Sequence, residues 1–141
     1  ARFRPEVLAR EPYLMVLPPD HPLAGADAVT AEQLAADRMV VRRHCEALPE
    51  ISRFFADRGV RPRFVLKTTS DERVLAVVRS GQGIGMMPAS FRDDRVRFVR
   101  VADFGLMREI GLLYGVAAAP LRDGGSTFIR LVREHYAGTK A

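Results

Sequence analysis

The chain has 141 residues, of which 48% are hydrophobic and 28% charged, with a formal net charge of +5 and a pI near 10.1. This length suits one ordinary domain or two small lobes, and no uninterrupted apolar run approaches the ~20 residues that span a bilayer. The single cysteine excludes an internal disulfide framework and suits a reducing compartment.

The first predicted elements are a strand, a short helix and a second strand. The run "EPYLMVLPP" predicts a buried strand that stops at Pro18 and Pro19. Thr30 and Gln33 have capping-box spacing and predict a short helix, after which "RMVV" predicts a strand. The capped helix therefore separates two buried strands.

A longer helix is predicted from Leu48, because Leu48, Ile51 and Phe55 fall on one helical face. Pro49 is tolerated only in its first turn, and Gly59 suits the position just after its end. The "RRHCE" segment therefore lies just before a helix N-terminus.

A third helix has the clearest sequence signals of the predicted helices. Thr69 and Glu72 have the spacing of a second capping box, and its apolar face runs to Gly81. The remaining predicted elements are strands at "PRFVLKT", "GIGMMP", Val96–Val101 and "EIGLLYGVA" and a closing helix from about Ser126 to Tyr136. Alternating strands and helices indicate an α/β layer architecture with a largely parallel sheet.

The basic residues are dispersed. They are almost all arginine, no run exceeds Arg42-Arg43, and in "RVRFVRV" they alternate with apolar residues as on a half-buried strand. Solvated surfaces are favoured over a nucleic-acid-binding stripe, which is the alternative that the net charge raises.

The glycines of "GQGIG", Gly81–Gly85, do not form a dinucleotide-binding loop. That fingerprint runs from a strand into a helix, whereas here a helix precedes a strand. We expect Gly81 to cap the helix, Gly83 and Gly85 to permit close packing, and no cofactor to be bound.

Cys45 lacks the partners that catalysis or metal binding requires. His44, Cys45 and Glu46 are adjacent, and consecutive residues rarely aim at one ion or align as a nucleophile and its base. We therefore expect no metal and no catalytic residue, and we see no acid-base pair for an enzyme. A reactive but noncatalytic thiol and a small side chain packed under a loop both stay open.

Two polar segments follow the carboxyl ends of predicted strands, namely "RRHCE" after Val41 and "TTSD" after the strand that ends near Lys67. In an open α/β sheet, ligands bind beyond the carboxyl ends of strands, where helix N-termini offer free N–H groups. These segments would suit an anionic small molecule, although Thr69 and Ser70 could equally serve only as helix caps.

In this order, the segments resemble the effector-binding region of LysR-type transcriptional regulators. The resemblance rests on "EPYLMVLPPDHPLAG", "VTAEQLAADRMVV", "FFADRGVRPRFVLKTTSDERVLAVVRSGQGIGMMPAS" and "REIGLLYG", and it covers nearly all of the chain. It implies an α/β fold like that of type 2 periplasmic binding proteins, with two Rossmann-like subdomains joined by two crossing strands.

The resemblance also implies a domain division. Residues 1–17 would belong to a partly present subdomain I and the first crossing strand, residues 18–108 to subdomain II, and residues 109–141 to the return strand and last helix of subdomain I. The winged helix-turn-helix that binds DNA in this family is expected outside this chain.

By the same resemblance, effector contacts are expected in an interlobe cleft, on three segments. They would come from Arg43, His44 and Cys45, from Thr69 and Ser70, and from Met87, Pro88 and Ala89. The "HC" pair resembles the reactive cysteine segment of peroxide-sensing members, but the second cysteine of those members is absent. An intramolecular disulfide switch is therefore excluded, and a mixed disulfide or sulfenic acid is not.

The sequence thus predicts a cytoplasmic ligand-sensing domain of a LysR-type regulator. Arg42 and Arg43 suggest an anionic organic effector, and the whole protein is expected to form homodimers or homotetramers, without membrane contact. The alternatives are a periplasmic-type solute-binding protein, an enzyme of the same fold and a thiol-based redox sensor through Cys45.

Overall fold

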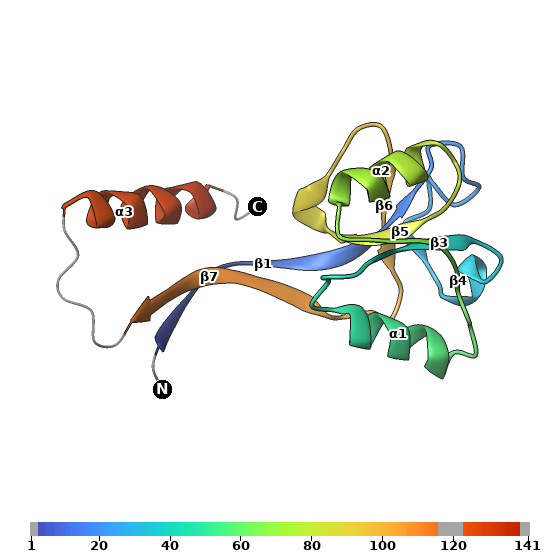
Figure 1. The fold of residues 1–141 in the computed structure, drawn as a ribbon, viewed down its shortest axis with the longest axis horizontal. Helices are drawn as coiled ribbons and strands as arrows, with labels where there is room; N and C mark the ends of the chain where they lie inside the picture. The colour runs from blue at the N-terminus through green and yellow to red at the C-terminus, as the bar shows by residue number, and fades with distance from the viewer. Residues whose placement is uncertain (1–2, 116–122, 139–141) are drawn as a thin grey trace. The chain divides into compact units, whose positions relative to one another are not determined.

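A computed structural model describes residues 3–115 and 123–138. The chain divides into two compact units, one formed by Pro12–Leu106 and the other by Ala1–Glu11 together with Met107–Ala141. The first strand, β1 (Phe3–Leu17), belongs to both units, because it crosses the boundary between them (Figure 1). The sequence predicted only its buried second half, since the first half lacks a continuous apolar run and its described side chains are exposed or half-buried before Glu11.

The Pro12–Leu106 unit contains two connected sheets. Its elements are β2 (Ala28–Val29), η1 (Glu32–Leu34), β3 (Arg38–Arg42), α1 (Leu48–Asp57), β4 (Arg63–Thr68), α2 (Asp71–Arg79), β5 (Gly85–Pro88), η2 (Ala89–Phe91) and β6 (Arg97–Val101). Strands β2, β6, β1 and β5 lie side by side in that order, and β3 pairs with β4. A parallel bridge between Met39 and Ile84 joins β3 to β5.

The sheet is mixed, which corrects the expectation of a largely parallel one. Strands β3 and β4 are parallel, as is the bridge from β3 to β5, but β1 runs antiparallel to both β5 and β6. The alternation of strands with helices described β3, α1, β4, α2 and β5 correctly. It did not apply to β1, because no helix connects that strand to the neighbours with which it pairs.

Two apolar clusters lie on the two faces of this sheet. On the α1 face, Met39 packs in a cluster with Ile51, Phe54 and Phe55. On the α2 face, Val40 packs with the buried residues of α2, which are Val74, Leu75 and Val78. Adjacent residues of β3 thus face opposite helices, as the alternation of side chains along a strand requires.

Most of the predicted helix ends are confirmed. Gln33 N donates to Thr30 Oγ1 at 3.2 Å and Thr30 N donates to Gln33 Oε1 at 2.9 Å, so the first capping box forms, around a single 3-10 turn. Helix α1 has a proline in its first turn, and Gly59 follows it with φ +69°. A left-handed φ of this kind favours glycine over every residue with a side chain.

The second capping box is wrong by one residue. Ser70, not Thr69, is the N-cap of α2, and its side chain accepts a hydrogen bond from Arg73 N at 3.3 Å. Thr69 is exposed. Adjacent threonine and serine residues both satisfy the cap preference, so the sequence could not decide which of them has the extended backbone that a cap requires.

The predicted close packing of Gly83 and Gly85 is confirmed. A Cβ atom at Gly83 would lie 3.2 Å from Arg38 O, and one at Gly85 would lie 3.2 Å from Val74 Cγ1. Both distances are shorter than ordinary van der Waals contacts of a Cβ atom, so these glycines allow the chain at β5 to approach β3 and α2.

The second unit contains the first half of β1, β7 (Met107–Gly115), which pairs with β1, and α3 (Asp123–Ala137). Arg133 Nε donates to Glu6 Oε1 at 2.8 Å, and Arg108 pairs with the buried Glu11. The closing strand and helix are confirmed, although the last residues predicted for the strand, 116 and 117, lie outside the described residues. Large apolar side chains of this unit are exposed, among them Phe3, Val7, Leu113, Phe128 and Leu131.

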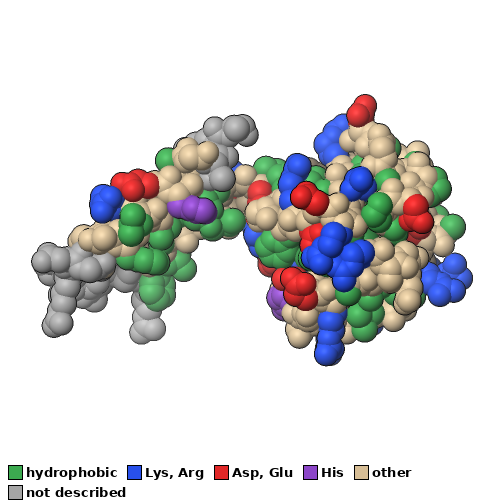
Figure 2. Space-filling model, turned by 90° about the horizontal axis from the view of Figure 1, so that it is seen from above, with side chains coloured by type: hydrophobic (Ala, Val, Ile, Leu, Met, Phe, Trp, Pro, Cys, Tyr) green, Lys and Arg blue, Asp and Glu red, His purple; other side chains and the backbone are tan. Residues whose placement is uncertain are grey.

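Basic side chains do not gather into one stripe on the face that Figure 2 shows. There the lysine and arginine side chains are interspersed with acidic, apolar and other groups. This view agrees with the interpretation of the dispersed arginines as solvated surface residues. No helix within residues 3–115 and 123–138 is long and apolar enough to cross a membrane.

Candidate functional site

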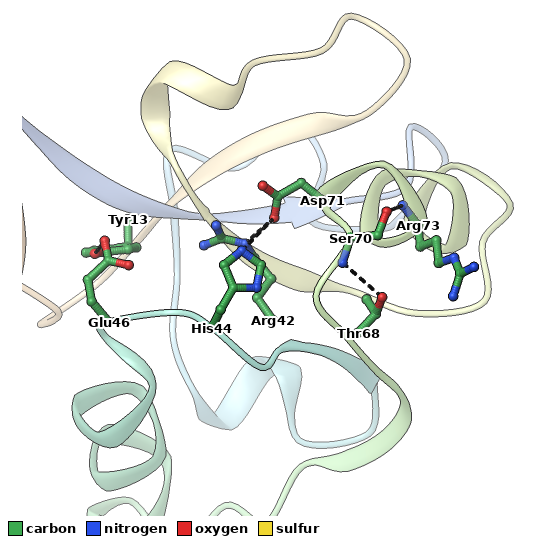
Figure 3. Close-up of polar contacts among 8 residues, drawn as sticks. All are labelled: Tyr13, Arg42, His44, Glu46, Thr68, Ser70, Asp71 and Arg73. Atoms are coloured by element: carbon green, nitrogen blue, oxygen red, sulfur yellow. Dashed lines mark hydrogen bonds and ion pairs between the residues drawn. The ribbon is translucent and has the colours of Figure 1, made fainter.

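The predicted polar segments meet where the parallel strands β3 and β4 end. Arg42 is the register partner of Thr68, and Arg43 N donates to Thr68 O at 3.0 Å. The segment after β3 therefore lies directly beside the start of α2. We call the group formed by Arg42, His44, Thr68, Ser70 and Asp71 the polar edge (Figure 3).

Arg42 is the buried cation of the polar edge. Only 6% of the residue is exposed, its Nε donates to Asp71 Oδ1 at 2.7 Å, and its guanidinium carbon lies 5.1 Å from the centre of the Phe91 ring. Both Arg42 and Arg43 suggested an anionic effector, but only Arg43 is among the effector contacts that the family resemblance implied. The signal that could have found Arg42 is strand alternation, which puts it on the same face as the buried Val40.

Of the two residues that follow, His44 approaches the same carboxylate. Its Nε2 lies 4.0 Å from Asp71 Oδ1, and about half of its side chain is exposed. Arg43 is exposed, and it contacts the polar edge through its backbone N–H. Asp71 thus lies between a buried guanidinium and a half-exposed imidazole.

The N-terminus of α2 completes the polar edge. Ser70 N donates to Thr68 Oγ1 at 3.0 Å, and Ser70 caps the helix, so the hydroxyl groups of both residues organise the first turn. Thr68 is buried, whereas Thr69 projects into solvent. The positive end of the helix dipole is therefore held next to Arg42, an arrangement that favours negative charge.

The third predicted segment, at the end of β5, reaches the polar edge through η2. Met87 and Pro88 are buried, Ala89 is half-buried, and the segment ends at Phe91, which lies against Arg42. Pro88 is also the register partner of Tyr13, whose hydroxyl donates to Glu46 Oε1 at 2.5 Å. The sequence did not indicate this tyrosine-glutamate pair, because 33 residues separate its members.

Cys45 lies on the other side of β3. It is 8% exposed, and it belongs to the apolar cluster on the α1 face. A cavity of about 280 Å³ opens there, lined by residues from β3, α1 and β4 that include Val41, Cys45, Ile51, Phe55 and Phe64. Such a setting fits a packed side chain, which was one of the two interpretations left open. The role of Cys45 as an effector contact stays a prediction.

The polar edge offers donors and positive charge for an anion. Arginine, a helix N-terminus and hydroxyl groups are the features that bind carboxylates and other oxyanions in proteins. Within the described part of the chain, no three His, Cys, Asp or Glu side chains lie close enough together to hold a metal ion.

Residues 1–137 match the family described as the LysR substrate binding domain. The chain belongs to this family. The fold of a LysR-type effector-binding domain, like that of type 2 periplasmic binding proteins, agrees with the mixed sheet and flanking helices described above.

Two curated relatives of this LysR-type domain are transcriptional regulators. The RuBisCO operon transcriptional regulator of Allochromatium vinosum is 35% identical over 83 residues, which are 58% of this chain and 28% of the relative. The Hca operon transcriptional activator HcaR of Escherichia coli K12 is 28% identical over 149 aligned residues, which cover 99% of this chain and 50% of HcaR. The chain thus spans half or less of each of these relatives.

Solved structures of regulators share the fold. A putative LysR family regulator from Pseudomonas aeruginosa has a TM-score of 0.79 at 19% identity, covering 96% of this chain and 49% of that one. The regulatory domain of CcmR from Synechocystis PCC6803, solved in complex with 2-PG, has a TM-score of 0.78 at 16% identity. The match covers 95% of this chain and 67% of the CcmR domain. The effector binding domain of QuiR, solved with shikimate, has a TM-score of 0.73 at 18% identity. The match covers 97% of this chain and 66% of the QuiR domain.

Proposed function

We propose that this LysR-type domain senses an anionic organic metabolite, and that it binds the metabolite at the polar edge. The observation that carries the proposal is the register of β3 and β4, which pairs Arg42 with Thr68 and so brings a cationic segment to the N-terminus of α2. Both are sites where oxyanions bind favourably.

The relatives support the same class of function. QuiR holds shikimate, which carries a carboxylate at neutral pH, and CcmR holds 2-PG. The named relatives are transcriptional regulators, which favours regulation over catalysis or solute transport. We infer that the effector biases the conformation of a larger regulator that has a DNA-binding part and assembles as a dimer or tetramer.

In this proposal, residues 18–108 act as regulatory subdomain II, and the predicted contacts are supplied by three groups of residues. They are Arg43, His44 and Cys45, then Thr69 and Ser70, then Met87, Pro88 and Ala89. The Arg43 backbone N–H already donates to Thr68 O, so Arg43 would contact the effector through its exposed side chain.

The test is a ligand screen on the full-length protein. Thermal unfolding and calorimetry would compare organic acids with their neutral amides or methyl esters at constant ionic strength. A ligand that binds only the folded state raises the unfolding midpoint in proportion to RT ln(1 + [L]/Kd). We expect stabilisation by one class of acid and none by its neutral analogue. Stabilisation by neutral ligands alone would contradict the proposal.

A further inference from the structure

One nitrogen of the Arg42 guanidinium is buried without a hydrogen-bond partner. The Arg42 side chain is 5% exposed, and its Nη1 makes no hydrogen bond to any residue that the structure describes. Burying an unpaired donor is costly, more so when the donor is charged, and native proteins pair the large majority of such groups. This donor therefore requires an explanation.

The rest of the guanidinium is already held in place. Asp71 accepts the Nε–H at 2.7 Å, and the Phe91 ring lies against the guanidinium at 5.1 Å. The N–H groups of a guanidinium diverge in a rigid plane, so Nη1 and Nε point in different directions. Asp71 and Phe91 thus fix the group while Nη1 remains able to donate.

The groups around Arg42 include cationic partners as well as the Asp71 carboxylate that pairs with it. The carboxylate of Asp71 is shared between Arg42 and His44, and the positive end of α2 begins at the same residue. A carboxylate or phosphate oxygen would accept the strongest hydrogen bond from Nη1, because hydrogen bonds between two charged groups are about twice as strong as neutral ones.

We propose that Arg42 anchors an oxyanion of the effector through Nη1, and that Asp71 and Phe91 act as positioning residues for its guanidinium. The inference rests on the proposed function, since it takes the polar edge as the binding site. It assigns specificity for negative charge to Arg42, in place of the exposed Arg43. Nη1 is covered by its neighbours, so an oxyanion can reach it only if they move aside.

The experiment titrates inorganic phosphate into the full-length protein, against sodium chloride at equal ionic strength, and follows thermal unfolding and calorimetric heat. We expect Arg42→Lys to weaken phosphate binding about tenfold or more, because lysine keeps the charge near Asp71 but lacks the planar fork. The control is Arg38→Lys, the same substitution at the exposed opposite end of β3, which should change the affinity less than twofold. The neutral double variant Arg42→Gln/Asp71→Asn should also lose phosphate binding.

Three results of the phosphate titration would overturn the inference. They are no specific effect of phosphate on the wild type, unchanged affinity in a folded Arg42 variant, and loss of the fold in both Arg42 variants, which would assign Arg42 to stability alone. An organic acid that binds the wild type and the Arg42 variants equally would overturn this inference but support the proposed function. If phosphate binding depended on Arg42 but no organic acid bound, the result would support an oxyanion site at Arg42 and contradict the proposed function.

Discussion

Strand β3 presents two different chemical environments on its two faces. On the α2 face, the Arg42 guanidinium lies beside Asp71 and the helix N-terminus, whereas on the α1 face Val41 and the nearby Cys45 line a largely apolar cavity, which Arg42 also borders. The residue with the more conspicuous chemistry in the sequence, Cys45, is on the apolar side, and an inconspicuous arginine is on the polar side. Residues close together in one motif can thus have unrelated roles, because successive strand residues face opposite sides and Cys45 lies in the turn after the strand.

The largest effect is expected on the apolar face. Phe55→Ala should lower the free energy of unfolding by about 3–5 kcal/mol, because Phe55 is among the largest fully buried side chains and already borders a cavity. Urea denaturation of the full-length protein would measure it. Phe64→Ala is the matched control, since Phe64 lines the same cavity but is 48% exposed and should cost far less. Equal losses would contradict the assignment of Phe55 to the core and of Phe64 to the exposed rim of the cavity.

The next effect is expected on the polar face. Asp71→Ala removes the partner of a guanidinium whose side chain is 5% exposed, and we expect a loss of about 2–4 kcal/mol. The double variant Asp71→Ala/Arg42→Met should recover part of that loss, because it no longer buries an unpaired charge. Glu72→Ala, at the exposed neighbouring position, serves as the control in the same denaturation series. If the loss in the double variant equalled the sum of the losses in Asp71→Ala and Arg42→Met, this result would argue against coupling between Arg42 and Asp71.

A smaller effect is expected at the cysteine. Cys45→Ser should cost about 1–2 kcal/mol, because it places a hydroxyl in an apolar cluster, and Cys45→Ala should cost less. In the wild type, a thiol reagent should label Cys45 much more slowly in the native protein than in urea, since the residue is 8% exposed. Fast native labelling, or an oxidant response that Cys45→Ser abolishes, would instead favour the thiol-sensor alternative.

The smallest pair of effects distinguishes the two candidate caps of α2. Ser70→Ala should destabilise the protein by about 1 kcal/mol, because it removes the acceptor for Arg73 N, whereas Thr69→Ala should change stability by only a few tenths. Thermal unfolding of the two variants provides the comparison. If Thr69→Ala were the more harmful, the corrected position of the cap would be wrong.

Local patterns predicted much of the fold. The apolar periodicity of α1 and α2, Pro49 in a first turn and Gly59 after a helix end were sufficient to place both helices within a few residues. The strands β3, β4 and β5 were predicted as well, since each is a short apolar run bounded by turn residues. Antiparallel pairing of β1 was not predicted, because pairing direction depends on contacts with residues about 70 or more positions away.

By itself, the sequence determined the order of elements, the family and the two polar segments, because these depend on residue type and spacing along the chain. Tertiary structure alone decided that Arg42 pairs with Asp71, that Cys45 faces the apolar cavity, and that Tyr13 bonds to Glu46. The physical reason is that burial and ion pairing depend on which face of a strand meets which helix. The packing of the whole unit determines which face contacts which helix, and the residues adjacent in the sequence do not indicate it.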